Sequence, residues 1–80
     1  MANSPLLEAE AAARFFDELQ ARGSSILGID AFVRKDDRIV PSLDLLIDCS
    51  ADDPAKAKSR CHAFIARAGN EALFEIWFAD

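Results

Sequence analysis

Hydrophobic and polar residues alternate in three segments, and this period of two predicts β-strands over residues 26–34, 42–49 and 73–78. In each strand one face is apolar, as expected where a sheet covers a core. In the first strand the alternation places Leu27 and Ile29 on the inner face and Ile26 on the outer one. The outer faces collect aspartates and aromatic rings in place of the Lys, Ser and Thr typical of solvated strands, which favours a contact surface.

Two further segments show the period of a helix, with apolar residues three or four positions apart. The first helix should begin at Ser4, a capping hydroxyl followed by proline, and end at Gly23. The second should begin at Asp53, again followed by proline, and end at Gly69. Each helix has one apolar stripe that we expect to face the sheet.

Taken in order, these segments predict an α+β domain, a two-layer sandwich of the order α-β-β-α-β, whose three-stranded sheet carries both helices on one face. Eighty residues make a single domain, 1–80, in which residues 1–4 are a short polar lead-in. The second helix must cross over the sheet, so the strands that flank it should run in the same direction. The third strand then lies beside the second or beyond the first, and the pattern leaves both orders open.

The first two strands should form a hairpin through the polar turn at residues 35–38, with a loop longer than two residues. Because Pro41 has no N–H to donate to a ladder, it marks an edge strand, a bulge or the beginning of a strand. The expected core combines the helical stripes with the inner strand faces. It consists of Phe16, Leu19, Ile29, Leu45, Ile47, Phe64, Ile65, Phe74 and Ile76.

The outer face of the predicted sheet is the strongest candidate for a functional site. Three large apolar side chains come from three separate strands, and one is the chain's only Trp, a residue type enriched in binding hot spots. Carboxylates around them would steer and select a positively charged partner. The alternative is that the N-terminal segment or the 35–41 loop covers these groups. The predicted partner-binding residues are Asp30, Phe32, Asp44, Leu46, Asp48, Glu75 and Trp77.

Composition and charge narrow the class of partner. The net charge is −5, from 14 acidic and 9 basic residues. Nucleic-acid binding needs a basic patch that releases counterions from phosphates, so it is disfavoured, whereas a basic protein partner is favoured. No apolar run approaches the roughly 18 residues of a membrane span. No basic region precedes an apolar segment near the N-terminus, so we expect no membrane partner and a cytoplasmic protein.

No converging set of residues predicts an enzyme, a metal site or a cofactor. Cys49 and Cys61 should both point into the core, where a bridge is sterically conceivable but two reduced thiols are favoured. The only histidine, His62, lies about 100° around the helix from Cys61 and lacks the further ligands that zinc requires. Asp44 and Asp48 are roughly 13 Å apart along a strand, too far to share a metal ion or a proton.

Residues 26–50 contain Gly-Ile-Asp-Ala-Phe at 28–32 and Pro-Ser-Leu-Asp-Leu-Leu-Ile-Asp-Cys-Ser at 41–50. This segment resembles, in style, small acidic bacterial immunity proteins, which neutralise a secreted or contact-delivered toxin. The resemblance covers about a third of the chain. It implies an acidic surface that blocks the basic substrate site of a nuclease-like toxin, and it transfers no individual residue role.

We therefore expect a non-catalytic, cytoplasmic protein-binding protein, an immunity protein that inhibits a basic toxin or another basic protein. The alternative is a small homodimeric structural module that uses the open sheet face or a strand edge. Stacking two open faces would bring Asp30, Asp44 and Asp48 close to their own copies, which argues against that form of dimer. Pairing along a strand edge avoids this repulsion.

Overall fold

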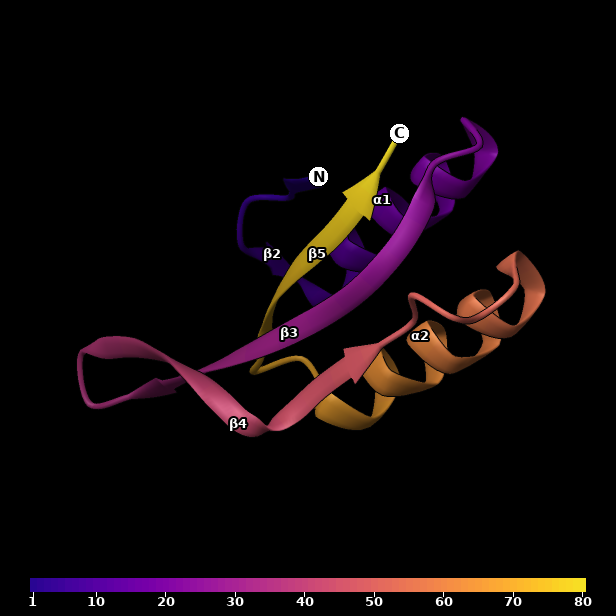
Figure 1. Cartoon of the computed structure of the whole chain (residues 1–80). Coiled ribbons are helices and arrows are strands. Elements are labelled where there is room, and N and C mark those ends of the chain that lie inside the picture. The colour runs from indigo at the N-terminus through magenta and orange to yellow at the C-terminus, as the bar shows by residue number, and fades with distance from the viewer.

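Two helices pack side by side on one face of a curled antiparallel sheet (Figure 1). The computed structural model describes the backbone of residues 1–80 and every side chain except that of Leu43. The elements are β1 (Ala2–Asn3), β2 (Leu7–Glu8), α1 (Ala9–Ala21), β3 (Ser25–Lys35), β4 (Arg38–Asp48), α2 (Pro54–Ala68) and β5 (Leu73–Ala79). The strand order is β1-β5-β3-β4, and β2 also pairs with β5.

The predicted three-stranded sheet in the order α-β-β-α-β is wrong, because the segment before α1 adds two short strands. Both β1 and β2 pair antiparallel with β5. Between them Ser4, expected as a helix cap, is only 3% exposed, and its backbone N–H donates to the carbonyl of Ile76. Pairing along β5 satisfies backbone groups that would otherwise be buried without partners, and it outweighs the local capping preference. Helix α1 therefore begins only at Ala9.

Strand β5 lies on the far side of β3 from β4, which decides the order that the sequence pattern left open. Both β4 and β5 are antiparallel to β3, so they run in the same direction, as the crossover through α2 requires. Strand β3 therefore lies between β4 and β5, which do not pair with each other. Among the three longer strands, β3 is the central one.

The β3–β4 hairpin is tighter than predicted and projects beyond the rest of the molecule (Figure 1). Lys35 pairs with Arg38, so only two residues form the turn and the prediction of a longer loop is wrong. Asp36 has a φ of 57°. Asp is one of the few residue types other than glycine that tolerate this conformation. The chain can therefore reverse direction within two residues.

A register shift between β3 and β5 changes which side chains reach the core. The pairing passes from Ile26–Phe78 to Gly28–Trp77, so Leu27 is an extra residue on β3. One inserted residue reverses the faces of the residues before it. Ile26 is therefore 6% exposed and packs in the core, whereas the strict alternation placed it outside.

A second register shift bends β4. Its pairing with β3 passes from Asp30–Leu46 to Phe32–Pro41, which advances two residues on β3 and five on β4. Strand β4 thus bulges at this point, and it is also the edge strand of the sheet. Pro41 sits where its missing N–H is tolerated, in an edge strand beside a bulge, as predicted.

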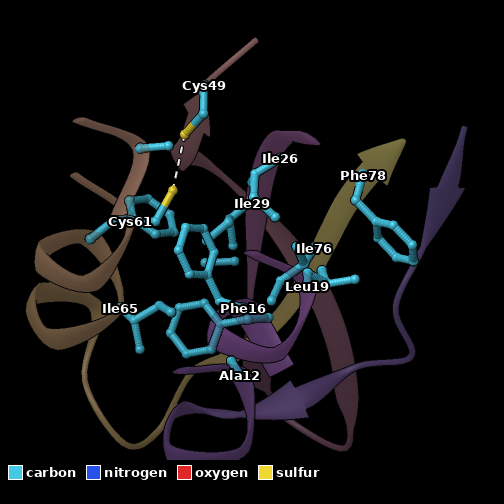
Figure 2. Close-up of a cluster of buried hydrophobic side chains, with 14 of the residues drawn as sticks. Ala12, Phe16, Leu19, Ile26, Ile29, Cys49, Cys61, Ile65, Ile76 and Phe78 are labelled. Carbon is cyan, nitrogen blue, oxygen red and sulfur yellow. Dashed lines mark hydrogen bonds between the residues drawn. The ribbon is translucent and has the colours of Figure 1, made fainter. Parts of the chain in front are cut away.

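One cluster of buried side chains joins α1, α2 and the inner sheet face (Figure 2). Within this cluster the rings of Phe64 and Phe74 pack edge to face with centroids 6.2 Å apart. Leu45 and Ile47, predicted as core residues, are only partly buried because they lie on the edge strand. The other predicted core residues are buried: Phe16, Leu19, Ile29, Phe64, Ile65, Phe74 and Ile76.

The predicted start of the second helix is confirmed. The Asp53 side chain accepts a hydrogen bond of 2.8 Å from the backbone N–H of Lys56, and Pro54 is the first helical residue. Gly69 follows the last turn with a φ of 87°. Neither of the two helices in the described chain has the length and apolar content needed to cross a bilayer.

Candidate protein-binding face

The sheet face opposite the helices, here called the open face, gathers most of the predicted partner-binding residues. Cross-strand pairing aligns its side chains in three rows that run across the strands. The first row is Trp77, Gly28 and Asp48, the second is Glu75, Asp30 and Leu46, and the third is Leu73, Phe32 and Pro41. Strand β1 extends the first row, because Asn3 pairs with Trp77.

The second row places two carboxylates directly opposite each other on neighbouring strands, Asp30 on β3 and Glu75 on β5. Like charges in this position destabilise a sheet. Each carboxylate has one neutral donor: the Trp77 indole N–H donates to Asp30 over 3.2 Å, and the Asn3 amide donates to Glu75. The pair is thus oriented by hydrogen bonds, but no cation of the described side chains forms an ion pair with it.

Gly28 explains how the Trp77 indole reaches Asp30. A Cβ atom at Gly28 would lie 2.5 Å from the backbone oxygen of Ile47, so only glycine fits the close approach of β3 and β4. The same residue leaves no side chain opposite Trp77 on β3. The half-buried indole can therefore extend diagonally across the face to the second row, where its N–H is held.

Apolar side chains border the carboxylate pair on the open face. Phe32 and Leu73 are paired across β3 and β5, and both are half-buried. Leu46, beside Asp30, is 57% exposed. The carboxylate pair is thus bordered by an aromatic ring on one side and by apolar side chains on the other.

Two of the predicted residues lie differently from the rest. The Asp48 carboxylate faces outward at the end of the first row, but it accepts hydrogen bonds from the backbone N–H and the hydroxyl of Ser50, at 2.9 and 2.6 Å. These bonds, that of the hydroxyl first, lower the pKa of Asp48. Asp44 is exposed in the bulged part of β4 and belongs to none of the rows.

Sequence reasoning missed Asn3 and Pro41 as members of this face. No local signal marks Asn3, because its place depends on β1 pairing with the other end of the chain.

Sequence reasoning also left His62 without a role. In the structure the Nε2 atom of His62 lies 2.8 Å from the Asp17 carboxylate, and the His62 ring packs edge to face with Phe16. His62 therefore links the two helices on the side away from the open face.

Among the described residues, no three His, Cys, Asp or Glu side chains gather in a metal-binding arrangement. A cleft of about 580 Å³ lies where the hairpin meets the α2–β5 connection, and it includes Glu8, Arg34 and Glu71. It is separate from the rows of the open face except at Leu73.

No family model, curated protein or solved structure matches this chain.

Proposed function

We propose that this protein is a non-catalytic binding protein that inhibits a basic protein, of the bacterial toxin-immunity kind, through its open face. The observation that carries the proposal is the second row, where Asp30 and Glu75 lie opposite each other between Trp77 and the apolar third row. Such a pair is unfavourable in the free sheet. A cationic group of the partner would relieve that repulsion, which gives the arrangement a physical purpose.

The chemistry of the second row suits an arginine of the partner. A guanidinium presents several N–H donors in one plane, which matches carboxylate oxygens, and its flat face stacks on aromatic rings. Asp30 and Glu75 offer the oxygens and Trp77 offers the ring. Leu46 and Phe32 would then exclude water around the ion pairs, as the apolar surround of a binding hot spot does.

The remaining properties support a basic protein rather than another class of partner. The net charge of −5 would speed the encounter with a positively charged surface and oppose contact with nucleic acid or an anionic membrane. We place the protein in the cytoplasm. Its two buried cysteines are free thiols, which fits a reducing compartment.

The test compares an anchor variant with a charge variant in binding kinetics. The partner is first captured from a lysate with the wild-type protein and purified. Trp77→Ala should then raise its dissociation rate by about 30-fold, because a hot-spot anchor contributes about 2 kcal/mol or more. Glu75→Gln should instead slow association and flatten its dependence on salt. Both rates are measured by surface-based binding kinetics.

Asp44→Asn is the matched control, since it removes one carboxylate from β4 outside the three rows. We expect it to change association less than Glu75→Gln does. Circular dichroism and melting curves show whether each variant is folded. If folded Trp77→Ala and Glu75→Gln bind the captured partner with wild-type rates, the interface lies elsewhere and the open face is not the binding site.

A second candidate function is a homodimer formed along the edge strand β4. It is favoured by Leu46 and Ile39, both on β4 and 57% and 43% exposed. Three features oppose it, because they interrupt the edge that a second strand would need. Pro41 lacks an N–H, the strand bulges beside it, and the Arg60 guanidinium donates to the edge carbonyl of Asp48 over 3.4 Å.

A further inference from the structure

Two thiols lie against each other inside the core. Cys49 follows β4 and is 1% exposed, and Cys61 lies on α2 and is 0% exposed. Their sulfur atoms are 3.0 Å apart, as the dashed line in Figure 2 marks. The two residues are 12 positions apart in the chain and come from different elements, so this contact is a product of the tertiary fold.

Both backbones are held in place on either side of the sulfur atoms. The N–H of Cys49 donates to the carbonyl of Leu27 over 2.8 Å, which continues the β3–β4 pairing. The helix that carries Cys61 is capped by Asp53. A disulfide has its sulfur atoms about 2.05 Å apart, so an approach of only about 1 Å separates the thiol pair from a bond.

We propose that Cys49 and Cys61 form a reversible disulfide that a small-molecule disulfide, such as oxidised glutathione, closes. One cysteine thiolate attacks a sulfur of oxidised glutathione, the glutathione S–S bond breaks, and one glutathione thiolate leaves. The second cysteine thiolate attacks the protein sulfur of this mixed disulfide and releases the other glutathione. The protein loses two electrons and two protons, and these convert one oxidised glutathione into two reduced molecules.

Because both thiols are buried, the disulfide can form only when the structure opens and exposes them. Burial, followed by the hydrogen bond between the two thiols, raises the pKa of the Cys61 thiol, so little reactive thiolate exists in the native protein. Exchange should therefore be slow in the native protein and fast during refolding. Once formed, the bond ties the end of β4 to α2 and restricts the unfolded chain. The melting temperature should rise on the order of 10 °C.

The experiment refolds the denatured, reduced protein in glutathione buffers of graded oxidation and then blocks remaining thiols with an alkylating reagent. We expect a monomer two hydrogens lighter than the reduced chain, a peptide cross-link between Cys49 and Cys61, and the higher melting temperature. Dithiothreitol should reverse all three. Cys49→Ala and Cys61→Ala are the matched controls, and neither should show the mass loss or the rise in melting temperature.

The proposal is overturned if the wild-type protein, refolded with excess oxidised glutathione, keeps two alkylatable thiols or accumulates glutathione adducts. It is equally overturned if the cross-linked form melts at or below the temperature of the reduced form, since the native fold would then resist the bond. Both outcomes are independent of the partner proposed above, because no partner is present in the measurement.

Discussion

At the end of β4 the Asp48 carboxylate accepts hydrogen bonds from the hydroxyl and the backbone N–H of Ser50. This residue lies on the open face, yet part of its capacity to accept hydrogen bonds is used inside the chain. The bonds lower the pKa of Asp48, with a smaller contribution from the charge of Arg60. Asp48 therefore differs from Asp30, whose described hydrogen bond comes from Trp77 in the candidate binding row.

This difference predicts a pH effect. The native pKa of Asp48 lies below the ordinary value of about 3.9, so the unfolded state binds more protons in acid. The stability contributed by Asp48 is therefore present above about pH 4 and is lost as the pH falls through the native pKa. In Ser50→Ala the pKa of Asp48 should rise and the loss in acid should be less steep. NMR titration of the carboxyl group measures this, and Ser59→Ala is the control. An unchanged titration midpoint in Ser50→Ala would contradict the assignment.

At the scale of the elements, the short N-terminal strands are joined to β5 at Ser4. Its hydroxyl accepts a 2.9 Å hydrogen bond from the backbone N–H of Ile76, in addition to the backbone bond between the two residues. The contact is buried. A side chain that the local pattern predicts as a helix cap thus closes an edge of the sheet.

Ser4→Ala leaves the Ile76 N–H buried without its partner, so we expect a loss of about 1–3 kcal/mol in the free energy of unfolding. Chemical denaturation followed by tryptophan fluorescence measures this loss. Ser24→Ala is the matched control, because the Ser24 hydroxyl bonds to Asp80 at the exposed surface, and its removal should cost less than about 0.5 kcal/mol. Equal denaturation midpoints for Ser4→Ala and wild type would show that β1 and β2 do not dock through this contact.

At the scale of the whole molecule, opposite charges lie on different sides. The open face carries Asp30 and Glu75, while the exposed side of α2 carries Lys56, Lys58 and Arg67. Two open faces would repel each other, and the β4 edge is interrupted. We therefore expect a monomer of 8.8 kDa at low micromolar concentration, measured by sedimentation velocity. A species of twice this mass that Leu46→Ala returns to the monomer would establish the edge-strand dimer instead.

The sequence by itself determined those features whose causes lie within a few residues. The start of α2 follows from Asp53 and Pro54, because a cap and a preset φ act locally. The outward faces of β4 and β5 near Leu46 and Trp77 follow from the period of two, which holds wherever no residue is inserted. The gathering of apolar and acidic groups on one face was predictable for this reason, although their function remains a proposal.

The tertiary structure alone decided the features that depend on distant partners. Ser4 meets Ile76 across 72 positions, and no local signal indicates that β1 and β2 would pair with the last strand. The same is true of Asp30 and Glu75, which became neighbours only when β5 lay beside β3. The extra residue at Leu27 shows only in the pairing of β3 with β5, so the assembled sheet determines it.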